Sequence, residues 1–397
     1  MLLAQRDGGG NAELDAEARH GMEWLTKMWT GDVLYAQVGI GVGHEKLRTD
    51  HDVWRLPEDD DKLDVAPGSV DYHIKHRPVF PANQPGAPIS PNLAGRVAAT
   101  FALSAQLRAG TDPTLARAQL DTAAQLYARA DRQPGALVTA YPPEYYPENS
   151  WLDDMEFGAT ELALAARALG DEREGAWTGE ATEWASRYLA SKERGSLGLA
   201  DVSAMAHADL AGLVGYGQAV SRQQLVDDIR RPLRDAVAVA DQFGSGVSIL
   251  EFDAVPHTFG LVITALLNRK LTGDETYDAF ATRQRNWALG ANAWGTSFVV
   301  GEGTTSLRCT SHQVANLTGE IPVGAVVNGP NAAKQFEVLN TFPTLRACPA
   351  DGVNPLAEFD GQGARFLDHA GAWASAETAI DFTSTALLAF TLAAKTG

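Results

Sequence analysis

The sequence predicts an all-α fold in which helix hairpins close on themselves into a toroid, with long loops gathered at the end that carries a cleft. Three observations predict this fold. Helical periodicity recurs along most of the chain, no segment between the helices alternates convincingly as a strand, and two long stretches rich in Gly, Pro and polar residues interrupt the helices. Because loops on a rigid scaffold usually carry function, we expect the loop end of the helix pairs to hold the cleft.

The first predicted helix covers residues 12–29. Apolar residues recur there at spacings of three and four, which is typical of an amphipathic helix: Leu14, Ala18, Met22, Leu25 and Met28. The preceding residues 1–11 contain three consecutive glycines, and we expect them to form a disordered N-terminal stub. No linker and no fixed-period repeat divides residues 12–397, so these are expected to form one domain.

A long loop follows over residues 35–91, where Pro, Gly and Asp are dense, and loops of this length in compact proteins are usually functional. Eight helices are then predicted in succession, over residues 93–108, 114–130, 155–169, 179–189, 201–213, 221–243, 257–271 and 275–289. Gly170 and Gly290 lie where helix C-caps are expected. A second long loop covers residues 295–363, and a last apolar helix covers residues 378–394.

The composition limits the classes of partner. The formal net charge of −18 repels phosphate backbones and anionic lipid, so it argues against nucleic acid and membrane surfaces. A neutral ligand fits this charge best, and an acidity that serves only solubility is the alternative. No apolar run is long enough to span a membrane, and residues 1–11 contain no apolar segment of the length that a secretory signal requires.

The sequence has two cysteines, Cys309 and Cys348. Because they form no Cys-x-x-Cys pair, a cysteine-based zinc site and a disulfide scaffold are both excluded. A single bridge between the two and a pair of unbonded buried thiols are both compatible with the sequence.

Two carboxylates and an aromatic residue stand immediately before the last predicted helix: Asp368, Trp373 and Glu377. Near a helix N-terminus the dipole stabilises a carboxylate as an anion, so one interpretation of Glu377 is a first-turn or capping residue. A general acid needs the opposite influence. Burial against Trp373 and repulsion from Asp368 would raise the pKa of Glu377 enough to hold a proton near neutral pH.

The same run resembles the C-terminal signature of family 9 glycoside hydrolases, which is an aromatic residue, any residue, Asp, four residues, an aromatic residue, three residues, Glu, and a small residue two positions later. The sequence departs from the family at Thr383, where the family has Asn. Five residues satisfy the pattern in order: Phe366, Asp368, Trp373, Glu377 and Ala379.

This resemblance implies a six-hairpin α/α toroid that hydrolyses β-1,4-glucosidic bonds of cellulose or related β-glucans with inversion. Glu377 would be the proton donor to the glycosidic oxygen, and Asp368 the supporting carboxylate. The resemblance also implies a secreted protein that needs no organic cofactor. A structural calcium ion has no support in the sequence beyond the acidic residues 58–61, and solvated surface acids are more common than such sites.

Residues 35–39 and 50–58 resemble the family's "QVG" and "DH..W..PE" segments, which line the sugar cleft. By this resemblance His51 and Asp52 would hydrogen-bond sugar hydroxyls and Trp54 would stack on a pyranose ring. The alternative is a structural hydrogen-bond knot in the loop. Trp151 is a further candidate stacking platform, with a core or rim tryptophan as its alternative.

Residues 287–303 resemble the stretch before the family's other signature, which ends in His, any residue, Arg. Here Ser311 and Gln313 stand at the two expected positions, and His312 lies one residue away. A cationic donor to the substrate is therefore missing, and His312 is either a sugar contact or a structural histidine. This departure leaves open another enzyme of an α/α toroid, such as an exo-acting glycosidase, an epimerase or a lyase.

An inverting glycosidase needs a second carboxylate about 6.5–9.5 Å from its acid. In the family this base belongs to an Asp-Ala-Gly-Asp segment, which precedes a helix that residues 12–29 resemble, and no such segment occurs in these 397 residues. The chain is therefore expected to be an N-terminally truncated family 9 domain that lacks the first helix of the toroid. A non-catalytic β-glucan-binding protein on the same scaffold is the alternative.

Overall fold

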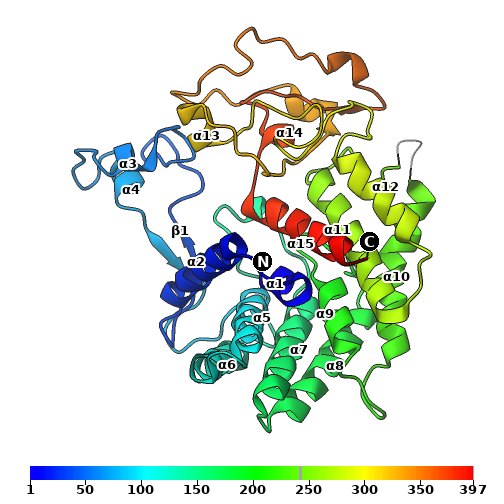
Figure 1. Ribbon diagram of the computed structural model, residues 1–397. Helices are drawn as coiled ribbons and strands as arrows, with labels where there is room; N and C mark the ends of the chain where they lie inside the picture. The colour runs from blue at the N-terminus through cyan, green and yellow to red at the C-terminus, as the bar shows by residue number, and fades with distance from the viewer. Residues whose placement is uncertain (241–243, 397) are drawn as a thin grey trace.

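The computed structural model describes residues 1–240 and 244–396, and most of them are helical or lie in long loops (Figure 1). The helices are α1 (Leu2–Gly8), α2 (Ala12–Met28), α3 (Pro57–Asp60), α4 (Tyr72–Lys75), α5 (Pro91–Arg108), α6 (Pro113–Ala128), α7 (Leu152–Leu169), α8 (Glu174–Ala190), α9 (Ser203–Leu210), α10 (Arg222–Val239), α11 (Ala254–Thr272), α12 (Asp278–Ala288), α13 (Gln313–Thr318), α14 (Trp373–Ala376) and α15 (Ile380–Thr396). Short 3₁₀-helices cover Pro143–Tyr145, Ala333–Phe336 and Ala357–Phe359.

Within the described residues, six helices close into an inner ring. In order around the ring, α1 packs on α5, α5 on α7, α7 on α9, α9 on α11, α11 on α15, and α15 returns to α1. The helices α2, α6, α8, α10 and α12 pack against this ring from outside, each antiparallel pair forming a hairpin (Figure 1). The predicted all-α toroid is confirmed.

The expectation of a disordered N-terminal stub was wrong. Leu2–Gly8 form α1, in which Ala4 is fully buried. Arg6 donates to both carboxylate oxygens of Asp209, at 2.8 and 3.0 Å, and lies 3.5 Å from Glu161. A helix of seven residues is too short to show periodicity, so it could not be predicted from the sequence. The first inner helix of the ring is therefore short rather than absent.

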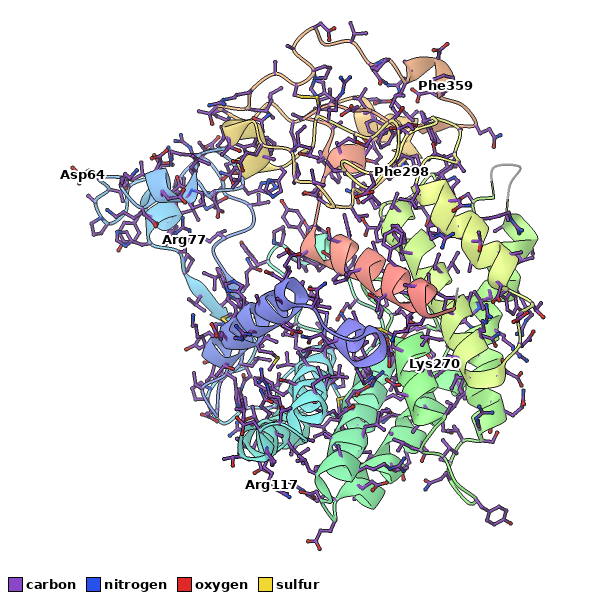
Figure 2. All side chains as sticks on the ribbon, viewed as in Figure 1. Asp64, Arg77, Arg117, Lys270, Phe298 and Phe359 are labelled. Atoms are coloured by element: carbon purple, nitrogen blue, oxygen red, sulfur yellow. A yellow bond between two sulfur atoms is a disulfide. The ribbon has the colours of Figure 1, made fainter. Side chains whose placement is uncertain are left out.

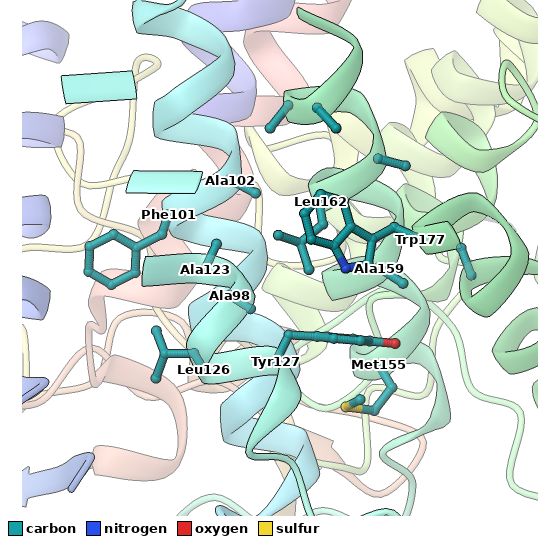
Figure 3. Packing of buried hydrophobic residues seen from close by; sticks show 14 of the residues in the cluster. Ala98, Phe101, Ala102, Ala123, Leu126, Tyr127, Met155, Ala159, Leu162 and Trp177 are labelled. Carbon is teal, nitrogen blue, oxygen red and sulfur yellow. The ribbon is translucent and has the colours of Figure 1, made fainter. Parts of the chain in front are cut away.

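The inner helices α5 and α7 approach each other closely because glycines face each other where they cross. A Cβ atom on Gly95 would lie 2.3 Å from the carbonyl oxygen of Asp154, and one on Gly158 would lie 2.9 Å from the carbonyl oxygen of Gly95. Around this crossing, apolar side chains of α5, α6, α7 and α8 fill the core, as Figure 3 shows for Phe101 and Leu162 among others. Small residues let the backbones meet and large ones fill the space between hairpins.

Most helix boundaries agree with the sequence signals. Gly170 ends α7 in the left-handed conformation with φ 65°, as expected. Ser221 begins α10 with a capping box that includes Gln224. The helix predicted over residues 221–243 ends at Val239, and residues 241–243 lie outside the described residues.

The two long predicted loops are present: the first contains α3 and α4, and the second lies above α15 in Figure 1. Each contains one antiparallel pair of very short strands: β1 (Tyr35–Val38) with β2 (Val79–Pro81), and β3 (Asn331–Ala332) with β4 (Ala364–Arg365). Strands this short carry no readable alternation.

A disulfide joins Cys309 to Cys348 within the second loop region, which decides between the two states that the sequence left open. In the described part of the chain, no helix is both long and apolar enough to cross a membrane.

Candidate active site

Glu377 lies in the short extended link between α14 and α15, where the second loop region meets the ring. Its amide donates to the carbonyl oxygen of Trp373 at 3.2 Å, and its own carbonyl oxygen accepts from the amide of Asn328 at 3.1 Å. The preceding carbonyl, of Ala376, accepts from the amide of Ser311 at 2.8 Å. The backbone is therefore held from two sides, while the side chain of Glu377 is exposed.

The Glu377 side chain is reached by solvent, but much of its surroundings is protein. This partial burial is the largest cause that raises its pKa to about 7, and the charges of Asp253 and Asp381 are the next two. Asp253 immediately precedes α11 and Asp381 lies in the first turn of α15. The sequence predicted that Asp368 would supply this repulsion. The structure corrects that prediction, because the carboxylates that act on Glu377 belong to the two neighbouring inner helices.

Two cavities adjoin this point. The smaller, of about 180 Å³, is lined by Asp253, Asp381 and His257, among others. The larger, of about 440 Å³, is lined by residues from β1 and its following loop, from the N-terminal turns of α5, and by Tyr145 and Tyr146. Leu199 lines both cavities. Glu377 lines neither, but Asp253 and Asp381 of the smaller cavity act on its pKa.

Tyr145 and Tyr146 connect the larger cavity to Glu377. Burial raises the pKa of both hydroxyls, and the charge of Glu377 raises them further. The hydroxyl of Tyr145 shares a hydrogen bond of 3.1 Å with Nε2 of His51. The structure thus places His51 on the same side of the molecule as the acid, although the two are far apart in the chain.

Asp368 is buried and is engaged by the backbone. It accepts hydrogen bonds from the amide of Cys309 at 2.7 Å and from the amide of Arg308 at 3.2 Å. Burial raises the pKa of Asp368, and these two donors oppose the rise. The Asp368 carboxylate therefore anchors the loop that carries the disulfide, next to the extended link that contains Glu377.

The contacts of Trp54 favour the structural alternative, whereas those of Asp52 leave its predicted role open. Oδ2 of Asp52 accepts from the amide of Thr49 at 2.8 Å and from its hydroxyl at 3.1 Å, which closes a turn. The charge of Asp52 also acts on Tyr145, which is the partner of His51. Trp54 is only 6% exposed and stacks on Phe342 with ring centroids 5.3 Å apart, so its ring has no free face for a sugar.

Trp151 and His312 are also used by the scaffold. Trp151 is half-buried, meets Trp184 edge to face at 5.3 Å, and lies under the Arg187 guanidinium. His312 caps α13 by accepting from the amide of Ala315 through Nδ1 at 3.1 Å. Neither residue lines the two cavities described above. The rim tryptophan and the structural histidine are the interpretations that these contacts favour.

Trp373 is half-buried and stacks on Phe252, with centroids 5.2 Å apart and an angle of 17° between the rings. Phe252 is 41% exposed and directly precedes Asp253. An exposed aromatic face therefore stands beside the carboxylates around Glu377.

Sequence reasoning missed several residues of this cleft: Asp253, Asp381, Phe252, Tyr145 and Tyr146. Two signals were available. Asp381 stands four residues after Glu377, and the tyrosines belong to a loop segment dense in Tyr and Pro. Asp253 and Phe252 carry no local signal, because only the packing of α11 on α15 brings them to the acid.

Three of the four acidic residues 58–61 are paired with cations of the chain itself. Asp59 lies 3.0 Å from Lys62 and Asp61 lies 3.0 Å from Arg77. Asp60 and Arg55 form a further pair. Among residues 1–240 and 244–396, no group of three or more His, Cys, Asp or Glu side chains is arranged to hold a metal ion.

Comparison with known families shows to which family the chain belongs. The family described as "Glycosyl hydrolase family 9" matches residues 4–390 of the chain. The chain belongs to glycosyl hydrolase family 9.

Curated relatives of this family 9 chain include Endoglucanase B of Cellulomonas fimi, which is 26% identical over 404 residues covering 88% of the chain and 35% of the relative. Endoglucanase A of Bacillus pumilus is 27% identical over 84% of the chain and 50% of its own length. The family 9 chain thus spans about a third to a half of these relatives.

Solved structures share the toroid. The cellulase Cel9M of C. cellulolyticum, in complex with cellobiose, has a TM-score of 0.70 at 18% identity and covers 100% of the family 9 chain and 83% of its own. The endoglucanase of the termite Nasutitermes takasagoensis has a TM-score of 0.70 at 19% identity, over 99% and 84% of the two chains. At this identity the likeness shows the fold alone.

Proposed function

We propose that this family 9 chain hydrolyses β-1,4-glucosidic bonds of cellulose or a related β-glucan with inversion, and that Glu377 is the general acid. The observation that carries the proposal is the exposed carboxyl group of Glu377 beside Asp253 and Asp381, where burial and these two charges raise its pKa to about 7. A carboxyl group with this pKa is partly protonated at neutral pH and can donate a proton, as an acid catalyst must. The curated relatives named endoglucanases support the same reaction.

In the proposed reaction, the Glu377 carboxyl gives its proton to the glycosidic oxygen as the bond from that oxygen to the anomeric carbon breaks. A water molecule attacks the anomeric carbon from the opposite face of the ring, and a second carboxylate takes the proton from this water. The new bond therefore has the inverted configuration. Because the Asp-Ala-Gly-Asp segment does not occur in these 397 residues, we assign the base to no residue of this chain.

The same proposal gives roles to the side chains around the acid. Phe252 and Trp373 offer a stacked aromatic face for a pyranose ring, and His51 with Tyr145 offers hydrogen-bonding groups for hydroxyls. A neutral glucan meets no electrostatic barrier at a chain of net charge −18. We further propose that the protein acts outside the reducing cytosol, because disulfides such as Cys309–Cys348 persist in oxidising compartments.

Replacement of the acid tests the proposed reaction. We expect Glu377→Gln to lower the release of reducing ends from cello-oligosaccharides by roughly 10²–10⁴-fold, the loss typical of removing a general acid. Binding of the same oligosaccharide, followed by titration calorimetry, should change little because the amide has nearly the same shape. Glu23→Gln, on the exposed face of α2, is the matched control and should keep full activity. Equal activity of Glu377→Gln and the parent would refute the assignment.

A second candidate function is non-catalytic β-glucan binding, and the absence of Asp-Ala-Gly-Asp from the sequence favours it. The same two measurements separate the candidates. A binding protein would take up the oligosaccharide with the affinity of its aromatic cleft, yet neither the parent chain nor the variant would release reducing ends.

A further inference from the structure

Glu377 is surrounded by acidic groups that come from different parts of the fold. Asp253 stands at the start of α11 and Asp381 in the first turn of α15, and these two inner helices pack against each other. Both carboxylates line the same cavity of about 180 Å³, together with His257. The two side chains therefore meet at one cavity from neighbouring helices, and both charges act on Glu377.

The backbone fixes this convergence. Asp253 adopts the left-handed conformation, with φ 64° and ψ 31°, which a non-glycine residue adopts only when its surroundings hold it there. Its carbonyl oxygen accepts from the amide of His257 at 3.0 Å, and the next residue but one, Val255, donates to the carbonyl oxygen of Asn328. Asn328 is also the residue whose amide binds the carbonyl oxygen of Glu377. One residue thus ties the backbones of both acidic segments together.

We propose that Asp253 and Asp381 are positioning residues that keep the proton on Glu377. They thereby set the highest pH at which Glu377 is still protonated and can act as an acid. The inference rests on the proposed function of Glu377, and it names the regulation of that same group. It assigns to these two carboxylates the repulsion of Glu377 that the sequence analysis expected from Asp368.

The physical cause is repulsion between like charges in a site partly closed to water. Three carboxyl groups that lie together cannot all ionise at the usual pH, so the cluster retains protons. Burial and Asp381 raise the pKa of Asp253 to about 6, and burial raises that of Asp381. The other ionisable groups that feel this cluster are Tyr145 and Tyr146.

In the described part of the chain, neither a lysine nor an arginine contributes to the pKa of Glu377. No such cation therefore offsets the repulsion between Glu377 and its two neighbouring carboxylates. The buried carboxylates elsewhere in the toroid differ in this respect, since Asp154 is paired with Arg96 and Glu161 lies 3.5 Å from Arg6. The acidic groups around Glu377 are therefore arranged to hold a proton rather than to balance a charge.

The direct test is a carbon-13 NMR titration of the Glu377 carboxyl, assigned by its loss in Glu377→Gln. The midpoint in the parent is expected near 7. Removing either neighbouring charge, in Asp253→Asn or Asp381→Asn, should lower this midpoint by about half a pH unit or more. Asn tolerates the left-handed conformation of Asp253, and Asp381→Glu should keep the parent midpoint because it keeps the charge.

Two controls separate this effect from a general loss of negative charge. Asp64→Asn removes one charge from an exposed loop beside α3 and α4, remote from α15 (Figure 2), and should leave the midpoint unchanged. Asp368→Asn should also leave it unchanged. A midpoint that stays at the parent value in both Asp253→Asn and Asp381→Asn, or that falls equally in Asp64→Asn, would overturn the inference.

The titration needs no turnover, so it remains decisive if the chain proves not to hydrolyse glucan and the proposed function fails. If the chain does hydrolyse glucan, the alkaline limb of its kcat/KM profile should move to lower pH in the two variants by the same amount as the NMR midpoint. A merely structural role of Asp253 and Asp381 would lower activity at all pH values without moving this limb.

Discussion

At the scale of single residues, the surroundings of a carboxylate decide what it does. Glu377 has like charges beside it and a pKa raised to about 7, whereas Asp368 has backbone donors and Asp52 closes a turn. Glu377, Trp373 and His51 could be singled out from the sequence because they belong to recognisable local patterns. The hydrogen bonds that Asp52 accepts from Thr49 depend on how the loop folds, so they could not be predicted.

A buried histidine shows the same dependence on surroundings. His207 on α9 is fully buried, with Nδ1 2.6 Å from Glu156 and Nε2 3.5 Å from Asp228. Burial alone would lower the pKa of His207, but the two carboxylates raise it to about 10. The charged imidazolium thus joins α7, α9 and α10 in the interior.

This arrangement predicts how stability changes with pH. In the unfolded chain His207 loses its proton near 6.5, whereas in the folded chain it keeps the proton up to about 10. The contribution of His207 to the free energy of unfolding is therefore complete below about pH 6.5 and declines as the pH rises toward 10. Urea denaturation at pH 7, 8, 9 and 10 should show this decline.

The comparison with His207→Gln isolates the effect. That variant should be less stable at pH 7 by about 3–5 kcal/mol, because a buried carboxylate loses its partner, and its decline toward pH 10 should be smaller. His44→Gln, in an exposed loop, should behave as the parent. A His207→Gln variant with the parent's pH dependence would show that the buried histidine is neutral.

At the scale of helices, α5 and α7 are placed by the glycines where they cross. Hydrophobic periodicity predicted both helices within a few residues of their observed ends, since α5 is Pro91–Arg108 and α7 is Leu152–Leu169. It said nothing of how close they lie, because the distance depends on which small residues meet. The pairing of α11 with α15, and with it the position of Asp253, was unreadable for the same reason.

The crossing predicts opposite effects for two glycine substitutions. Gly95→Ala places a methyl group against the backbone of Asp154, which cannot move aside as a side chain can, so the free energy of unfolding should fall by about 1–3 kcal/mol. Gly21→Ala lies in α2 with nothing near its Cβ position and should stabilise the protein by about 0.5–1 kcal/mol. Urea denaturation of both variants measures these two changes in the free energy of unfolding. Two variants of equal stability would contradict the close approach of α5 and α7.

At the scale of the whole molecule, α1 closes the ring. Arg6 binds Asp209 of α9, and Asp7 lies 3.0 Å from Lys270. Lys270 is near the end of α11 and is labelled in Figure 2. The succession of helices and two long loops made the toroid predictable, because each hairpin carries its own local pattern. The N-terminal helix escaped prediction, because its charged partners lie 155 to 263 residues away in the chain and the glycines after it indicate a break.

The central claim, that Glu377 donates a proton to the departing oxygen, is tested most directly by varying the leaving group. Aryl β-cellobiosides with poor leaving groups need a proton donor, whereas 2,4-dinitrophenolate departs without one. We expect Glu377→Gln to lose roughly 10²–10⁴-fold in kcat on a poor leaving group and far less on the dinitrophenyl substrate. An equal loss on both substrates, or no hydrolysis of either by the parent chain, would contradict the account.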